Sequence, residues 1–324
     1  MSVCFGGSAD LDHGLLAHRV EPGIRSVTRI AESLALHHQA RDNPIMQTPR
    51  NPSFGQRVGI LLALLLAGLA GLLLLDPIPQ DPAYHLFADT RTFFGIPNFN
   101  DVVSNAGFAL VGMLGLIAVA GARRYVLFVR ASDARPYLAF FAGVALVSLG
   151  STWYHLAPST ERLLWDRLPM SIAFMALAAA VVADRIHAQA GNGWLLLVLV
   201  LVGLASLLYW HVTERLGRGD LRFYGFVQFY PVILFPLVAW LFPRHRYVSN
   251  RYLLLIFAWY ALSKVMEFLD AQVFNLLGYT VSGHTLKHLT AAVSASVVFM
   301  MLASRPRRED SRYVGADNER GVVK

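Results

Sequence analysis

The stretch VGILLALLLAGLAGLLLL, residues 58–75, contains no charged side chain. Its length approaches the roughly 20 apolar residues that a helix needs to cross a bilayer core. Seven further stretches have few or no Asp, Glu, Lys or Arg residues: 102–122, 136–160, 168–183, 186–213, 223–243, 251–270 and 284–304. Because lipid cannot satisfy backbone polar groups, each segment must satisfy its own. The pattern predicts an all-α integral membrane protein with eight spans.

The composition of the whole chain agrees with this prediction. Of its 324 residues, 15% are charged and 55% are hydrophobic, whereas soluble domains carry roughly 25% charged residues. Ordinary soluble enzymes and disordered chains are thereby excluded. The one cysteine excludes a disulfide framework and a cysteine-ligated metal cluster. The net charge is +7, but the basic residues flank apolar segments, which favours a role in membrane topology over nucleic-acid binding.

Arginine residues are unevenly distributed between the two sides of the predicted spans. One side holds Arg50, Arg57, Arg123, Arg124, Arg130, Arg135, Arg185, Arg244, Arg246, Arg251, Arg305, Arg307, Arg308 and Arg312. The other side holds Arg91, Arg162, Arg167, Arg215, Arg218 and Arg222. Since arginine-rich loops remain in the cytoplasm, we expect both termini to be cytoplasmic, in the inner membrane if the source is a bacterium.

The two ends of the chain differ from the apolar middle. Residues 1–56 contain no long apolar run and none of the short apolar core of a secretory signal. They form either a disordered cytoplasmic arm, or a segment in which Met46 is the true initiator and residues 46–57 lead into the first span. We favour the second interpretation. Residues 305–324 are predicted to be a disordered cytoplasmic tail.

Polar residues at the ends of three spans are the candidate functional residues. Ser151 and His155 are four residues apart near the end of one span, and Asp166 follows eleven residues later at the mouth of the next. His284 and His288, also four apart, open the last span. Residues four apart share a helix face, and ionisable groups at membrane depth are costly unless they serve a function.

The predicted topology places all five residues at one membrane depth, on the non-cytoplasmic side. Three neutral imidazoles with one open position are the ligand set of a hydrolytic zinc site, so His155, His284 and His288 are candidate zinc ligands. Zinc lowers the pKa of bound water and polarises a carbonyl group. Asp166 could transfer the proton, and the Ser151 hydroxyl could stabilise an oxyanion.

Each feature also has a simpler interpretation when it is taken alone. A pair of histidines four apart is usually a surface or interhelical pair, and Ser151 alone is typical of a packing serine. Asp166 could begin a helix and pair with Arg167. The combination of all five residues at one depth is what favours a metal site.

The order of these residues resembles the alkaline ceramidases and the wider CREST superfamily, which includes the adiponectin-receptor-like proteins. Residues 150–170, GSTWYHLAPSTERLLWDRLPM, are similar to that family's G-S-x3-H stretch followed by L-D-x-L-P-M. Residues 98–105, NFNDVVSN, resemble the stretch that opens its first core helix. The resemblance implies a seven-helix CREST-like domain at residues 96–304, preceded by one additional transmembrane helix at residues 57–75.

The resemblance also implies an activity, that of a zinc-dependent membrane amidase. Such an enzyme hydrolyses the N-acyl bond of ceramide or a related lipid to a long-chain base and a fatty acid. His155, His284 and His288 would bind zinc, with Asp166 and Ser151 as catalytic residues. The substrate would be a membrane lipid with an N-acyl chain, and no nucleic-acid partner is expected.

One departure from the family pattern concerns calcium. Eukaryotic alkaline ceramidases carry an acidic calcium-binding cluster before the first core helix, including a glutamate where this chain has Asn98. The local carboxylates here are only Asp89 and Asp101. The departure argues against a calcium requirement, and the chain is more similar to the bacterial members of the family.

Two other functions remain compatible with parts of the sequence. A receptor or sensor could keep a structural zinc site with little turnover, although retention of Asp166 favours chemistry. A transporter could use Lys264, Glu267 and Asp270, which recur every three residues, but we find no repeated halves of the kind transporters show. Mutual pairing is the expected role of these three residues, and Asp270 lies near the level of the histidines.

Overall fold

The computed structural model describes residues 52–121 and 127–304. The proposed start at Met46, most of the predicted N-terminal arm and the whole predicted tail lie outside the described residues. The described part is all-α, with a single isolated bridge between Phe93 and Ile96 as its only β feature. The prediction of an all-α fold is therefore confirmed for these residues.

The described helices follow one another in a simple order. The long helices are α2 (Phe54–Leu74), α4 (Ala106–Ala120), α6 (Arg135–Leu156), α7 (Thr160–Arg185), α9 (Trp194–Arg215), α10 (Arg222–Leu241), α11 (Asn250–Phe268) and α13 (Gly283–Ala303). The shorter elements are η1 (Pro82–His85), α3 (Phe99–Val103), η2 (Ala131–Ala134), α8 (Ala188–Gly191) and α12 (Asp270–Leu276).

Seven of these helical segments are long and apolar enough to cross a membrane, with α3 and α4 counted together. Helices α11 and α12 together form an eighth candidate, broken by a bend of 81°. The chain is thus a multi-pass membrane protein, as predicted from its apolar runs.

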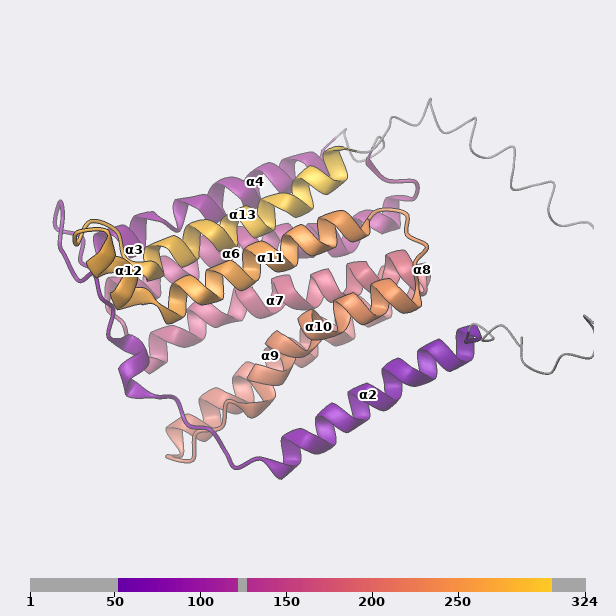
Figure 1. The fold of residues 1–324 in the computed structure, drawn as a ribbon, viewed down its shortest axis with the longest axis horizontal. Helices are drawn as coiled ribbons and strands as arrows, with labels where there is room; N and C mark the ends of the chain where they lie inside the picture. The colour runs from indigo at the N-terminus through magenta and orange to yellow at the C-terminus, as the bar shows by residue number, and fades with distance from the viewer. Residues whose placement is uncertain (1–51, 122–126, 305–324) are drawn as a thin grey trace, which may run out of the picture. The chain divides into compact units, whose positions relative to one another are not determined.

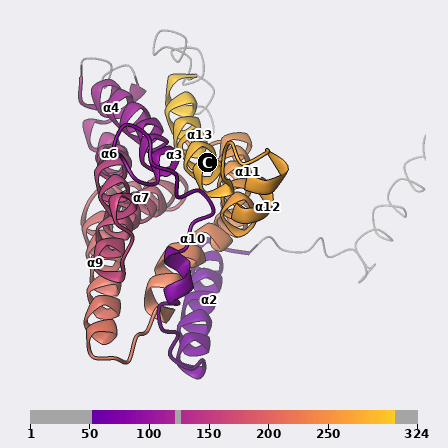
Figure 2. The ribbon, with the colours of Figure 1, turned by 90° about the vertical axis from the view of Figure 1, so that its left-hand side faces the viewer.

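The described helices pack into a bundle with α6 and α7 at its centre. Helix α6 packs against α4 and α7, helix α7 also packs against α9, and α11 packs against α13. Figure 1 shows α4, α13, α6, α11 and α7 running side by side, with α3 and α12 together at one end. Figure 2 views the bundle from that end, where α3 lies between α6 and α13 and contacts both.

Glycine residues allow close helix contact at that end of the bundle. A Cβ atom on Gly150 would collide with the carbonyl oxygen of Trp165, so the absence of a side chain lets α6 and α7 touch beside the candidate site. Similarly, a Cβ on Gly283 would lie 2.6 Å from the Cα of Asp270. Small residues at such contacts are typical of membrane helices, whose association depends on close packing.

Helix α2 is the additional N-terminal helix that the sequence predicted. None of its residues is buried within the described structure, as expected of a helix whose surface meets lipid. It packs against α10. Arg57 donates a 2.9 Å hydrogen bond to the carbonyl oxygen of Leu241, and Arg222 on α10 donates to the carbonyl oxygens of Leu72 and Leu75.

The structure corrects two predicted helix boundaries. The span predicted at 168–183 begins eight residues earlier, at Thr160, because the Ser159 hydroxyl caps the helix by accepting from the backbone N–H of Arg162. Asp166 therefore lies inside α7 rather than at its mouth. The span predicted at 186–213 is wrong in its first part, where the chain turns through α8 and Asn192, whose amide donates to Asp133 over 2.6 Å.

Candidate metal centre and active site

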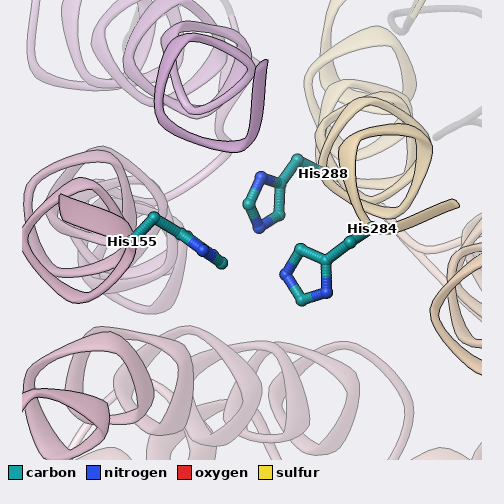
Figure 3. Close-up of side chains that lie close together, drawn as sticks. All are labelled: His155, His284 and His288. Atoms are coloured by element: carbon teal, nitrogen blue, oxygen red, sulfur yellow. The ribbon is translucent and has the colours of Figure 1, made fainter. Parts of the chain in front are cut away.

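Three buried histidines face one another where α6 meets the start of α13. His155 lies at the end of α6, and His284 and His288 occupy the first two turns of α13 (Figure 3). Their ring centroids are 4.8 to 4.9 Å apart, and one nitrogen of each ring lies within 4.8 Å of the others. Each residue is at most 4% exposed. The structure thus brings together the three histidines that the sequence singled out.

The start of α13 is fixed by hydrogen bonds that orient His284. The Ser282 hydroxyl accepts a 3.0 Å hydrogen bond from the backbone N–H of Thr285, which caps the helix. The Asp270 carboxylate accepts a 2.7 Å hydrogen bond from the backbone N–H of His284. Its other oxygen accepts from the backbone N–H of Ala88 over 2.9 Å. Asp270, which lies at the break between α11 and α12, is therefore hydrogen-bonded both to the helix that carries His284 and to the loop before α3.

A serine on the neighbouring segment is hydrogen-bonded to the ring of His288. Ser104 Oγ lies 2.8 Å from His288 Nδ1 and donates its own proton to the carbonyl oxygen of Asp101 over 3.0 Å. When the serine proton is directed to that carbonyl oxygen, the serine oxygen is free to accept from Nδ1–H, and in this tautomer Nε2 keeps its lone pair for a metal. Such outer hydrogen bonds are the usual partners of metal-binding histidines.

The donor set fits a zinc ion. Three imidazoles with no carboxylate among them suit zinc better than calcium or magnesium, which prefer oxygen ligands. His155 Nδ1 is buried and has no hydrogen-bond partner within the described residues. A buried polar atom without a protein partner is rare and calls for an explanation such as an ion. A tetrahedral zinc site with three protein ligands would leave its fourth position open.

Asp166 and Ser151 lie beside this centre. Ser151 sits one helical turn before His155 on α6, and its hydroxyl is within hydrogen-bonding reach of the Asp166 carboxylate. Ser151 is 1% exposed and Asp166 is 6% exposed. Both line the same cavity as His288. The five residues predicted from sequence therefore gather at one end of the bundle.

The cavity that these residues share extends into the apolar core of the bundle. It has a volume of about 120 Å³, and we call it the apolar cavity. Its polar end is formed by Ser151, Asp166, Ser263, Lys264, Lys287 and His288, and Tyr260 also contributes to its wall. Most of the remaining lining is aliphatic or aromatic, including Phe108, Phe140, Val144, Phe174, Leu177 and Phe235. Apolar cavities with a few convergent polar groups are typical of small-molecule sites.

The acidic and basic residues near the end of α11 form a paired cluster. Glu267 accepts from Lys264 over 2.5 Å and from Lys287 over 2.6 Å. Its carboxylate also accepts a 3.1 Å hydrogen bond from the Tyr84 hydroxyl. Pairing of Lys264 with Glu267 is confirmed. Pairing of Asp270 with them is wrong, because the bend after Phe268 turns Asp270 toward the backbone of α13.

Residues 98–105 lie against the candidate metal centre. Ser104, which contacts His288, belongs to this stretch. Asn98 donates a 2.8 Å hydrogen bond from its side-chain amide to the carbonyl oxygen of His155. Asp101 accepts from the Thr285 hydroxyl over 2.6 Å. Asp89, the other carboxylate of this region, pairs with Arg91 at 2.7 Å. Burial opposes the effect, but the hydrogen bonds from Arg91 lower the pKa of the Asp89 carboxyl below its usual value.

Sequence reasoning missed several groups around the centre. Phe87, from the loop before α3, packs its ring 4.7 Å from the His155 ring and 4.5 Å from the His284 ring. Lys287 is another such group, and its ammonium lies 3.4 Å from His284 Nε2. The spacing of Lys287 between the two histidines was the available signal for its position. Nothing in the sequence pointed to Phe87.

Comparison of the sequence with protein-family models and with curated proteins gave no match.

Proposed function

We propose that this protein is a zinc-dependent membrane amidase that hydrolyses the N-acyl bond of ceramide or a related lipid. The observation that carries the proposal is an apolar cavity whose polar end includes Ser151, Asp166 and His288, the last of which belongs to the cluster of three buried histidines. The candidate metal ligands, the carboxylate of Asp166 and the hydroxyl of Ser151 thus lie next to a cavity that is lined mainly by apolar side chains. The resemblance of residues 150–170 to the alkaline ceramidases supports the same activity.

The apolar cavity suits the acyl chain of such a lipid. An acyl chain that enters between the helices would contact mainly aliphatic and aromatic side chains, which favours its burial. Its amide group would then reach the polar end, where Ser151, Asp166 and His288 lie. The products would be a long-chain base and a fatty acid.

The residues have distinct roles in this hydrolysis. A zinc ion held by His155, His284 and His288 would supply a Lewis acid for the carbonyl group and lower the pKa of a water molecule. Asp166 would accept a proton from the attacking water and deliver it to the leaving amine nitrogen. The Ser151 hydroxyl would donate a hydrogen bond to the carbonyl oxygen as negative charge develops on it.

The orientation follows from the arginine distribution and belongs to the same proposal. Both termini would be cytoplasmic, and the metal centre would lie toward the non-cytoplasmic side of the membrane. If the source is a bacterium, this membrane would be the inner membrane. Cysteine-accessibility labelling from either side of sealed vesicles measures this directly.

The decisive test combines zinc analysis with a hydrolysis assay. Purified protein in detergent would be offered a panel of N-acyl lipids, and zinc would be quantified in the wild type, Asp166→Asn and His155→Ala. We expect about one zinc per wild-type chain with release of fatty acid, zinc without turnover in D166N, and loss of both in H155A. His211→Ala, on α9 and away from the cavity, is the matched control and should keep both.

The other outcomes distinguish the competing functions. Zinc with no turnover on any lipid of the panel would contradict the amidase and favour the receptor or sensor with a structural metal. Absence of zinc after reloading would contradict the metal centre itself.

A further inference from the structure

Arg167 is a buried cation held by three aromatic rings. Its guanidinium carbon lies 4.7 Å from the ring centroid of Trp210, 5.0 Å from that of Tyr224 and 5.4 Å from that of Tyr84. The residue is only 8% exposed, and its Nη1 is buried with no hydrogen-bond partner among the described residues. The rings stabilise the cation, but they leave the donors on Nη1 unused.

No carboxylate of the described residues lies within ion-pair distance of Arg167. The ion pairs within residues 52–121 and 127–304 do not include it. Arg222, which lies nearby on α10, is a useful contrast, because Asp220 receives both its Nε and Nη2 donors at 2.9 and 2.8 Å. The arginine with a carboxylate partner and the arginine without one line the same cavity.

That cavity is distinct from the apolar cavity and adjoins it at the catalytic carboxylate. We call it the polar cavity, after the charged side chains that stand among its otherwise largely apolar lining; its volume is about 780 Å³. Asp166, Met170, Lys264 and Lys287 line both cavities. The side chains that line only the polar cavity include Arg167, Tyr84, Gln228 and Glu267. A lipid whose amide lies at Asp166 would therefore place its acyl chain in one cavity and its head group in the other.

The charges around this junction do not balance. Lys264 and Lys287 share the one carboxylate of Glu267, and Arg167 adds a third cation. With Asp166 ionised, two negative charges face three positive ones. An excess positive charge therefore remains in a region that membrane helices surround. Buried charges are stable only when they are paired, and an anion in the polar cavity would provide the missing partner.

We propose that Arg167 binds an anionic head group, a phosphate, carboxylate or sulfonate, of the N-acyl lipid substrate. The proposal rests on the amidase function and narrows its substrate class from ceramide, which carries no charge, to related N-acyl lipids with an anionic group. An arginine fork matches the oxygen atoms of such groups. A neutral head group leaves the same donors unsatisfied, so Arg167 selects against neutral lipids as well as for anionic ones.

A matched pair of lipids tests this proposal. N-palmitoylglycine and N-palmitoylethanolamine share an acyl chain and an amide but differ in the carboxylate. Native mass spectrometry of the purified protein identifies each intact lipid by its mass, so binding is measured separately from hydrolysis. We expect the wild type to prefer N-palmitoylglycine by about tenfold or more, the usual effect of a hydrogen bond to a charged group.

Substitutions of Arg167 test whether this residue causes the preference for N-palmitoylglycine over N-palmitoylethanolamine. Arg167→Gln should bring the ratio close to one, while Arg167→Lys, which keeps the charge, should retain part of it. Arg162→Gln is the matched control, since Arg162 lies on the same helix and also stacks on a ring, that of Trp153 at 4.0 Å, but lines neither cavity. It should keep the wild-type ratio. If R167Q does not elute as a folded monodisperse protein, R167K carries the comparison.

The possible results separate this proposal from the proposed function. A wild-type ratio near one, or a preference that survives in R167Q, would overturn the anionic head group. Inorganic phosphate is the third probe. Phosphate that raises the melting temperature of the wild type but not of R167Q, with equal binding of the two lipids, would assign the site to a free anion and also overturn the proposal. A preserved preference without hydrolysis would contradict the amidase alone.

Discussion

The backbone N–H of His284 donates a 2.7 Å hydrogen bond to the carboxylate of Asp270. The bond joins the first turn of α13 to the first residue of α12, just after the 81° bend. The position of one candidate metal ligand therefore depends on the break between two other helices.

Replacement of Asp270 should loosen the centre without removing a ligand. Asp270→Asn keeps the shape of the side chain but loses its charge, which weakens its hydrogen bonds to His284 and Ala88. We expect zinc affinity to fall about tenfold, as for other outer-shell changes, and the protein to lose about 1–2 kcal/mol of stability. Competition with a chelator and thermal unfolding measure the two effects.

Asp184 provides the matched control for that substitution. Its carboxylate also accepts backbone N–H groups, from Arg246, Tyr247 and Val248, but at the opposite end of the bundle. Asp184→Asn should lower stability and leave zinc affinity unchanged. Equal zinc affinities in D270N and D184N would contradict the role given to Asp270.

Ser104 should matter to zinc through the tautomer of His288. Ser104→Ala removes the oxygen that accepts from Nδ1–H, so the imidazole loses its fixed orientation. We expect zinc affinity to fall about tenfold to a hundredfold, measured by competition with a chromogenic chelator. Ser148→Ala removes a hydroxyl that bonds only within α6, to Ala145, and should have no effect. Unchanged affinity in S104A would show that the bond does not orient the ligand.

Gly150 should be intolerant of any side chain. A methyl group there would collide with the carbonyl oxygen of Trp165, so Gly150→Ala must push α6 away from α7 beside Ser151 and Asp166. Forcing extra volume into a packed contact costs about 2 kcal/mol. Thermal unfolding in detergent should show a lowered melting temperature, together with weakened turnover. Gly59→Ala on α2, where the new methyl group meets nothing within 4 Å, should be neutral or stabilising.

Glu267 should be more important for stability than either of its lysine partners. Glu267→Gln leaves Lys264 and Lys287 without their carboxylate partner, and because the three side chains are only partly buried we expect a cost of about 2 kcal/mol, below that of a fully buried pair. Lys264→Met should cost less, because Glu267 keeps its bond to Lys287. Adding K264M to E267Q should recover part of the loss in a thermal unfolding assay. A double variant less stable than E267Q would contradict this electrostatic account.

The sequence was sufficient for those features that depend on short stretches of chain. Apolar runs such as residues 58–75 predict spans because backbone groups in lipid must be satisfied within one helix. The spacing of His284 and His288 predicts a shared face because a helix turns once in 3.6 residues. The common depth of His155, Asp166 and the two histidines of α13 followed from counting spans, and the described structure brings these residues together.

Only the tertiary structure decided which distant groups complete the site. The bend after Phe268, the hydrogen bond from His288 to Ser104 and the ring of Phe87 all involve contacts between segments far apart in the chain. Arg167 shows the difference most clearly. Its sequence neighbour Asp166 suggested a local ion pair, but three aromatic rings from other elements surround its guanidinium instead. Local sequence sets the direction of a side chain along its helix, whereas packing of the other helices sets what it meets.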